Sequence, residues 1–445
     1  MGPYIPMTEE DKRQMLKRIG VSSFEELIVD IPPEARFKGR LRLPEAVSEY
    51  EVKKILEDIA EQNLRLTIFA GGGSYDHYVP APVLHIMARP EFYTAYTPYQ
   101  AEVSQGTLQA MYEYQSLICE LTGMDVANAS MYDGGSALAE AGLMALRIRP
   151  KRNVILYPAN LNPLYKRVID SYFHGQRLQL QEVKFDNETG QLDLDDLKAK
   201  LNEDVAGVIV QHPNFFGVLE DVFEIERIVH EVGAALIVSF DPISLGILAP
   251  PGEYNADIAV AEGQPLGLPL AFGGPYLGIF TAKFEYIRQM PGRISGKTID
   301  AVGNTGFVMT LQTREQHIKR ERATSNICSN QQLCALGVAV YLSLMGKEGI
   351  KEVAEQSLFR AHYLAEKLQA IGFPLVFKGP FFREFAVRTP KPANEIVDNL
   401  VDEGFLAGVP LSLFGMDDDL LLIAVTEKRT KQEMDSFVSK LKELL

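Results

Sequence analysis

A helix start rich in small residues is the first candidate for a binding site. Directly before an apolar helical run, the stretch YDGGSALAEAGLMAL places four small or polar residues, Asp133, Gly134, Gly135 and Ser136. Small residues leave the free N–H groups of a helix N-terminus open to an anion, and the Ser136 hydroxyl adds a donor. An ordinary Gly/Ser helix cap has the same pattern, and the short motif by itself favours the cap.

Asp241, in LIVSFDPISLG, is the second candidate. It ends a strand that we expect to be buried on both faces, where an ionised carboxylate needs a partner. The protonated ring nitrogen of a bound pyridine is one such partner, and an ionised Asp would make that ring a better electron sink. A structural Asp that caps the following turn through neighbouring N–H groups is an equally good interpretation.

A loop suited to an aldehyde cofactor lacks the amine that would bind it. The stretch DIAVAEGQPLGLPLAFGGPYLG, residues 257–278, predicts a strand, a loop and a second strand, and the chain has no lysine between Lys200 and Lys283. Gln264 and Pro265, in the loop, supply no amine nucleophile. Lys283 ends the second strand, beyond the loop, and Lys297 lies further still.

Two other segments concentrate side chains that could meet a ligand or a partner. FYTAYTPYQAEVSQGTLQ carries Tyr93, Tyr96 and Tyr99, and an aromatic-polar loop of this kind is typical of a pocket wall or an interface. A buried loop with internally satisfied hydroxyls is the alternative.

The second of these segments, TREQHIKRERATSNICSNQ, covers residues 313–331 of an acidic protein. It gathers five basic side chains, Arg314, His317, Lys319, Arg320 and Arg322. A solvated helix with its charges in water is the usual interpretation, although Glu315 and Glu321 neutralise only part of the positive charge.

Two glycine-containing stretches only imitate ligand-binding motifs. GRISGKT, residues 292–298, is too short for a phosphate-binding P-loop and has Pro291 where that loop needs its first glycine. FAGGGSYDHYVP, residues 69–80, is not followed directly by a helix, so we expect a tight turn. The histidines show no metal-ligand spacing, and we expect no metal site.

These candidates are positioned by an alternation of strands and helices from about residue 150. Apolar strands at NVILYP, LQLQEVKFD, VAGVIVQ and AALIVSFD alternate with helices of about ten residues, one of which begins at Asn162 and Pro163. Together with DIAVAEG and PYLGIFTA, they predict a mainly parallel sheet covered on both faces, at whose carboxyl ends ligands bind.

We expect three parts in the chain. Residues 1–64 form a helical segment with a Ser48–Glu51 capping box, residues 65–330 the large sheet domain, and residues 331–445 a small α/β domain. In the small domain, a long helix leads to short strands at FPLVFK, EFAVRT and LLLIAVT, and the last helix begins with a Thr430–Glu433 capping box.

Composition excludes several classes of protein. The 445 residues carry a net charge of −15, which argues against a nucleic-acid-binding surface. The N-terminus lacks the apolar core of a signal peptide, and the longest apolar-rich run, residues 334–346, is too short to cross a bilayer. Three scattered cysteines form neither a disulfide framework nor a zinc site, so we expect a cytoplasmic protein with reduced thiols.

The long stretches YTAYTPYQAEVSQGTLQAMYEYQSLICELTGMDVANASMYDGGSALAEA and LQTREQHIKRERATSNICSNQ resemble the P-protein family of the glycine cleavage system. The likeness covers essentially the whole chain. The sequence is similar to the N-terminal half of the family's long chain, which also occurs as a separate subunit, subunit 1. It implies the fold of type I pyridoxal-phosphate transferases, with a seven-stranded large domain and a small C-terminal domain.

The resemblance also implies the chemistry. The assembled enzyme decarboxylates glycine on pyridoxal phosphate and transfers the aminomethyl group to the lipoyl arm of a carrier, H-protein. The cofactor lysine belongs to subunit 2, in an α2β2 assembly, so this chain is the non-catalytic partner. The resemblance matches the family's phosphate-binding turn to Gly134, Gly135 and Ser136, and its pyridine partner to Asp241. It implies that these residues are remnants of a cofactor site.

The tyrosine loop and the basic segment are then expected to build the rim of the partner's active site. Two other hypotheses stay open. In the first, the chain is an autonomous pyridoxal-phosphate enzyme that uses Lys283 or Lys297. In the second, it is a regulatory protein that senses a small anion in the vacant pocket.

Overall fold

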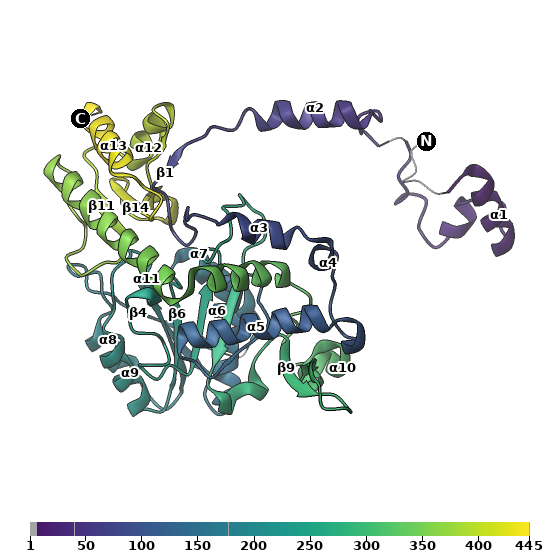
Figure 1. Cartoon of the computed structure of the whole chain (residues 1–445), viewed down its shortest axis with the longest axis horizontal. Helices are drawn as coiled ribbons and strands as arrows, with labels where there is room; N and C mark the ends of the chain where they lie inside the picture. The colour runs from purple at the N-terminus through teal and green to yellow at the C-terminus, as the bar shows by residue number, and fades with distance from the viewer. Residues whose placement is uncertain (1–6, 40, 177, 445) are drawn as a thin grey trace. The chain divides into compact units, whose positions relative to one another are not determined.

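The computed structural model describes residues 7–39, 41–176 and 178–444 and divides the chain into two compact units, residues 1–64 and 65–445 (Figure 1). The first unit contains α1 (Glu9–Ile19), a 3₁₀ turn (Glu25–Ile28) and α2 (Glu49–Ala60). The expected capping box of α2 is present, since the Ser48 hydroxyl accepts from the Glu51 N–H and the Glu51 carboxylate accepts from the Ser48 N–H. A second box, Thr8 with Asp11, begins α1.

The second unit is built on a seven-stranded sheet with the order β2-β8-β7-β6-β5-β3-β4. Its strands are β2 (Val126–Ala127), β3 (Val154–Pro158), β4 (Gln179–Val183), β5 (Val205–His212), β6 (Ala235–Phe240), β7 (Ile258–Glu262) and β8 (Gly278–Ala282). The strands from β4 to β7 are parallel to one another, whereas β8 is antiparallel to both of its neighbours. The predicted mainly parallel sheet is confirmed, and the short edge strand β2 was not predicted.

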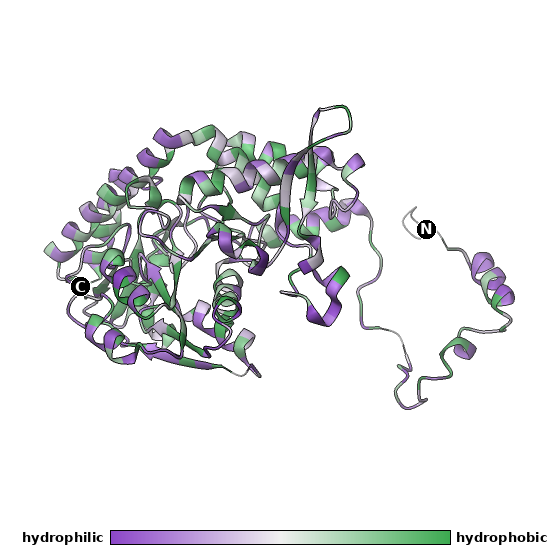
Figure 2. Ribbon diagram, turned by 90° about the horizontal axis from the view of Figure 1, so that it is seen from below, coloured by the Kyte–Doolittle hydropathy of each residue, from purple (hydrophilic) through white to green (hydrophobic). Residues whose placement is uncertain are grey.

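The helices described in the second unit are α3 (Ala81–Met87), α4 (Pro90–Tyr93), α5 (Gln105–Thr122), α6 (Gly134–Ile148), α7 (Pro163–Phe173), α8 (Leu194–Lys200), α9 (Val222–Glu231), α10 (Gln316–Lys319), α11 (Gln332–Ala370), α12 (Ala393–Asp402) and α13 (Lys431–Glu443). Among them, α5, α9 and α11 cover one face of this sheet, and α6 and α7 cover the other. Hydrophobic and hydrophilic bands alternate along the covering helices (Figure 2), as expected for helices with one face on a core.

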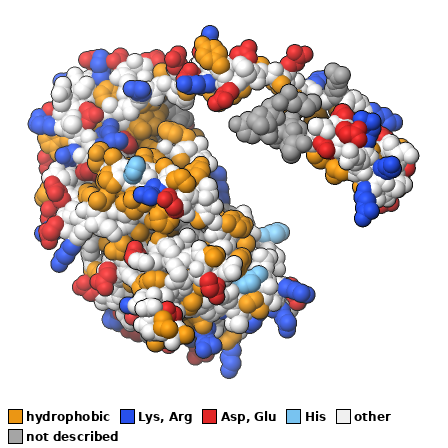
Figure 3. Space-filling model, turned by 45° about the vertical axis from the view of Figure 1, so that its right-hand side comes forward, with side chains coloured by type: hydrophobic (Ala, Val, Ile, Leu, Met, Phe, Trp, Pro, Cys, Tyr) orange, Lys and Arg blue, Asp and Glu red, His pale blue; other side chains and the backbone are white. Residues whose placement is uncertain are grey.

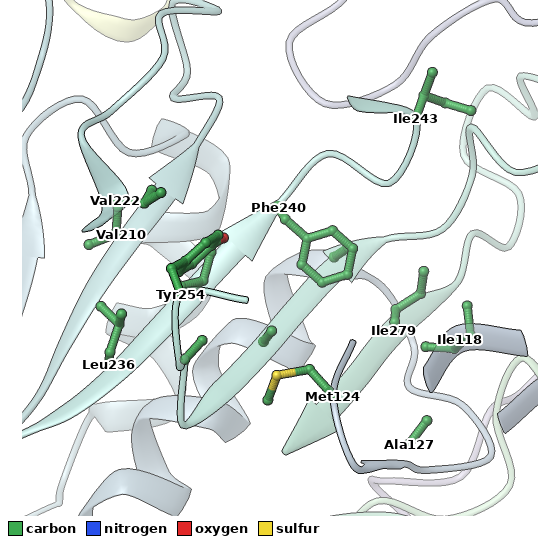
Figure 4. Packing of buried hydrophobic residues seen from close by; sticks show 14 of the residues in the cluster. Ile118, Met124, Ala127, Val210, Val222, Leu236, Phe240, Ile243, Tyr254 and Ile279 are labelled. Carbon is green, nitrogen blue, oxygen red and sulfur yellow. The ribbon is translucent and has the colours of Figure 1, made fainter. Parts of the chain in front are cut away.

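The two faces of the sheet divide the core between them. Leu236, Val238 and Phe240 of β6 pack with residues of α5, α9 and α11 (Figure 4), whereas Ala235 and Ile237 pack with α6 and α7. Side chains alternate along a strand, so a strand that is apolar at every position needs a helical layer on each side. That requirement places the carboxyl ends of β5, β6 and β7 in the interior, where the candidate site lies.

Three smaller sheets complete the unit. They are the parallel pair β1 (Thr67–Ile68) and β12 (Phe405–Leu406), the hairpin β9 (Ile294–Ile299) and β10 (Thr305–Thr310), and the antiparallel sheet of β11 (Glu384–Arg388), β14 (Leu420–Ala424) and β13 (Val409–Pro410). Because β1 pairs with β12, the start of the second unit joins its C-terminal part. The boundary at residues 330 and 331 stays a prediction.

Two local expectations are wrong. The stretch FPLVFK makes a single bridge, Leu375 to Val387, and no strand. GRISGKT, which sequence reasoning excludes as a P-loop, runs into strand β9 and pairs with β10. The basic segment is no long helix, because the only α-helix described between residues 313 and 331 is the four-residue α10.

Helix α11 is the one described helix that is long and apolar enough to cross a membrane by length and composition alone. Gly346 interrupts it with φ 58°, and the helix is kinked there. The apolar part before the kink packs Cys334, Val338 and Tyr341 into the core of the sheet. It therefore serves as a core helix within this unit.

Candidate functional site

A small cavity with a mixed polar and apolar lining lies beyond the carboxyl ends of β5, β6 and β7 and has a volume of about 40 Å³. Six segments line it, residues 73–75, 162–165, 211–217, 239–242, 262–265 and 382–384. This is the place where an open α/β sheet binds ligands. A cavity of that volume holds one or two water molecules, whereas pockets for small-molecule ligands usually measure about 300 Å³ or more.

The predicted anion-binding turn begins α6, and the N–H groups of Gly134 and Ser136 donate to carboxylates of this chain. Asp133 is the N-cap and its Oδ1 accepts from the Ser136 N–H at 2.7 Å. The Gly134 N–H donates to Glu262 Oε2 at 3.0 Å. A Cβ on Gly134 would lie 2.9 Å from the backbone N of Glu262, so the glycine permits this close approach. The structure thus shows a helix cap at this position.

Glu262, at the end of β7, fills the space in front of that helix terminus. Its Oε1 accepts from the N–H groups of Gln264 at 2.9 Å and Leu277 at 3.1 Å, and its side chain is buried. Burial raises the pKa of Glu262 to about 7, and this effect outweighs the hydrogen bonds from three backbone N–H groups, which lower the pKa. The helix terminus is therefore supplied with a carboxylate from the chain itself.

Asp241, the predicted pyridine partner, is paired with an arginine from a distant part of the chain. Arg383 Nη2 lies 2.5 Å from Asp241 Oδ2, and the two side chains are 1% and 14% exposed. Asp241 Oδ1 also accepts from the Ile243 N–H at 2.9 Å, which is the turn-capping role considered as the alternative. The buried carboxylate thus has its counter-ion within the protein.

Arg383 is itself surrounded by groups that suit a buried cation. Its Cζ lies 3.8 Å from the centre of the Tyr75 ring, and its Nη1 contacts His77 Nε2. Burial, followed by the positive charge of Arg383, lowers the pKa of His77, so the imidazole is neutral. Sequence reasoning missed Arg383. The signal was its position in the largely apolar stretch PFFREFAV, because a charge buried with such a stretch needs a partner.

A second buried carboxylate completes the cluster. Glu384 Oε1 accepts from the Gly72 N–H at 2.6 Å and its Oε2 accepts from the Tyr75 hydroxyl at 2.7 Å. Burial raises the pKa of Glu384 to about 7. Gly72 and Gly73 have φ of 74° and 118°, so the predicted tight turn is confirmed, and it brings Tyr75 into the cavity.

These residues do not fit pyridoxal phosphate. The helix terminus that would face a phosphate faces Glu262, and the carboxylate that would face a ring nitrogen faces Arg383. No lysine lines the cavity. The two alternative lysines are elsewhere, since Lys283 Nζ donates to Asp257 Oδ1 at 2.8 Å and Lys297 is exposed on β9. The charged groups of the cavity are thus paired with one another within the chain.

The structure brings the tyrosine loop and the basic segment together. The ring of Tyr99 packs edge-on against His317 with centroids 5.1 Å apart, and its hydroxyl accepts from Arg293 Nη2 at 3.1 Å. Arg293 Nε also lies 3.3 Å from Glu315. Sequence reasoning missed Arg293, which lies directly before strand β9.

The other members of the two segments differ in exposure. Tyr93 and Tyr96 are 67% and 77% exposed, and they line a cavity of about 140 Å³. Arg320 and Arg322 are also exposed. Arg314 is buried and donates to the backbone carbonyls of Leu311, Met290 and Gly292, so its expected place on a charged surface is corrected to a structural one.

Comparison with known proteins decides the family. The model of the glycine cleavage system P-protein matches residues 2–441. The chain belongs to the P-protein family. It is 53% identical to the probable glycine dehydrogenase (decarboxylating) subunit 1 of Chloroherpeton thalassium over 99% of this chain and 100% of that one. It is also 53% identical to the corresponding protein of Carboxydothermus hydrogenoformans, over 98% of each chain.

The fold of this P-protein family member agrees with that of solved structures. It is similar, with a TM-score of 0.90 and 42% identity over the full length of both chains, to a glycine decarboxylase (P-protein) of the glycine cleavage system in inhibitor-bound form. A glutamate decarboxylase from Lactobacillus brevis shares the fold with a TM-score of 0.68 at 15% identity. The expected fold of type I pyridoxal-phosphate enzymes is thereby confirmed.

Proposed function

We propose that this chain is the subunit 1 of a decarboxylating glycine dehydrogenase, and that it serves the enzyme without holding the cofactor itself. The observation that carries the second part is the internal pairing of charged groups in the cavity, where the Gly134 N–H donates to Glu262 and Asp241 faces Arg383. The relatives named subunit 1 support the first part.

In this proposal, pyridoxal phosphate is bound covalently by a lysine-bearing subunit 2, in an α2β2 assembly. The assembled enzyme decarboxylates glycine and passes the aminomethyl group to the lipoyl arm of H-protein. The three cysteines, Cys119, Cys328 and Cys334, are free in the structure, which agrees with a reducing compartment such as the cytoplasm.

Reconstitution tests the proposal. We expect the purified chain with added pyridoxal phosphate to show background glycine–bicarbonate exchange, and its mixture with subunit 2 to exceed the sum of the separate subunits at least a hundredfold. Borohydride reduction should leave pyridoxyl-lysine in subunit 2 alone. Exchange by the isolated chain, or stoichiometric labelling of Lys283 or Lys297, would establish the autonomous enzyme instead.

We also propose that the tyrosine loop and the exposed arginines form part of the rim around the partner's active site. Tyr96 offers a rigid ring with a polar tip, and Arg320 and Arg322 are exposed cations on a chain of net charge −15. Such cations raise the association rate of anionic partners, and a carboxylate substrate and an acidic lipoyl carrier are both anionic.

Kinetics of the assembled enzyme test the rim. We expect Arg320→Ala to lower kcat/KM for the carrier about three- to tenfold at low salt, with a smaller loss at high salt, because exposed charges act mainly on association. Tyr96→Phe should lower it about threefold or more. Assembly and melting temperature should stay unchanged.

Arg167→Ala, an exposed arginine on α7, is the matched control and should keep wild-type kinetics. A lower melting temperature with intact kinetics in Arg320→Ala would show instead that this arginine is structural.

A further inference from the structure

The N-terminal unit exposes large apolar side chains at a much higher density than the rest of the described chain. Among the described residues, seventeen of the thirty-three exposed large apolar side chains lie before residue 65, in about a seventh of the chain. Neither α1 nor α2 contains a buried residue, and Figure 3 shows apolar side chains at the surface of this unit. A soluble chain seldom exposes so many apolar side chains unless a partner covers them.

Helix α2 organises part of this surface into a stripe. Val52, Ile55, Leu56 and Ile59 follow one another at spacings of three, one and three residues, which places them on one side of a helix. They are 43%, 49%, 59% and 55% exposed. Charged residues occupy the other positions from 53 to 58, so the stripe has the apolar centre and polar border of an interface.

The helix is built to form but is too short to be stable without a surface. Its capping box fixes the start, and Lys53 lies 3.7 Å from Glu57 one turn later. Twelve residues are nevertheless marginal for an isolated helix in water, because most helical stability comes from packing of the apolar face. The stripe therefore needs an apolar groove, as in other helix-in-groove contacts.

The size of the surface and the extent of the family match indicate the occupant. The described part of the unit exposes seventeen large apolar side chains, a number on the scale of the about 20–30 residues that each partner contributes to a standard interface of about 800 Å² a side. The P-protein match begins at residue 2, so this unit belongs to the chain common to the family. The relatives are named subunit 1, a name that requires a different second subunit.

We propose that the stripe Val52–Ile55–Leu56–Ile59 docks into an apolar groove on that second subunit and is a main contact of the assembly. The proposal rests on the proposed function, because the lysine-bearing subunit is the partner named there. The N-terminal unit then acts as an arm that ties the two kinds of subunit together.

The test compares two variants with the same change of net charge. Ile55→Glu/Ile59→Glu places two carboxylates in the stripe, and Lys54→Glu makes the same change of −2 on the opposite side of α2. Binding to subunit 2 is measured by isothermal titration, and melting temperature and sedimentation are measured on each isolated full-length chain. We expect the double variant to bind at least tenfold more weakly, Lys54→Glu to stay within threefold of wild type, and all isolated chains to melt alike.

Other occupants give other results. Unchanged affinity in the double variant overturns the proposal. A lower melting temperature of the isolated double variant shows that the stripe packs on its own chain, and loss of a wild-type homodimer shows that a second copy covers it. If the wild-type chain does not bind subunit 2 at all, the proposed function fails as well.

Discussion

Replacing Arg383 by alanine lowers the free energy of unfolding by about 3–5 kcal/mol, the cost of breaking a buried ion pair by removing one partner. Arg383 is 1% exposed and faces the Asp241 carboxylate at 2.5 Å. Without the guanidinium, Asp241 keeps only the Ile243 N–H as a close partner in a largely buried position. Tyr75 also loses the cation stacked on its ring.

Urea unfolding of the isolated chain measures this loss. Arg388→Ala is the matched control, because Arg388 lies on the same strand β11 and pairs with Asp417 and Asp419 while 48% exposed. We expect that control to cost at most about 1 kcal/mol, as exposed ion pairs do. Equal losses in the two variants would show that the Arg383–Asp241 pair does not hold the site together.

The double variant Arg383→Met/Asp241→Asn separates charge from packing. It removes both charges and keeps side chains of similar length and shape. We expect it to be more stable than Arg383→Ala, because no unpaired carboxylate remains in the interior. A double variant as unstable as Arg383→Ala would assign the loss to packing of the arginine instead.

Replacing Glu262 by glutamine changes how stability depends on pH. The pKa of Glu262 is about 7 in the folded chain against an ordinary value of 4.5. Between these pH values the folded chain holds a proton that the unfolded chain has released, so the stability of the wild type falls as pH rises through this range. Glutamine does not titrate and removes this contribution.

The expected size follows from the shift of the pKa. Between pH 4.5 and pH 8, we expect the wild type to lose about 3 kcal/mol of unfolding free energy relative to Glu262→Gln. The size follows because each unit of pKa shift corresponds to about 1.4 kcal/mol. Urea unfolding at four pH values measures it. Glu203→Gln, at an exposed position, should move the difference by less than about 0.5 kcal/mol.

Glu384 has its pKa raised to about 7 in the same cluster, so the variant should retain part of the wild-type pH dependence. A difference that does not change between pH 4.5 and pH 8 would mean that Glu262 titrates alike in the folded and unfolded chain. The carboxylate would then be held at the α6 terminus without a cost of burial.

The sequence by itself determined the sheet, the helix starts and the missing lysine. Strands such as AALIVSFD are apolar at nearly every position, on both faces, and that pattern requires a sheet covered on both faces. Asn162 before Pro163, and Thr430 three residues before Glu433, mark helix starts, and both caps are present. These features follow from local periodicity and capping chemistry, which a sequence shows directly.

Only the tertiary structure decided what fills the site. Arg383 lies 142 positions after Asp241 and Glu262 lies 128 positions after Gly134, and no local pattern pairs residues so far apart. The same holds for Arg314, whose burial against three carbonyls turned an expected surface charge into a structural one. Pairing of buried charges depends on which segments the fold brings together, because a buried charge takes its partner from space and not from sequence.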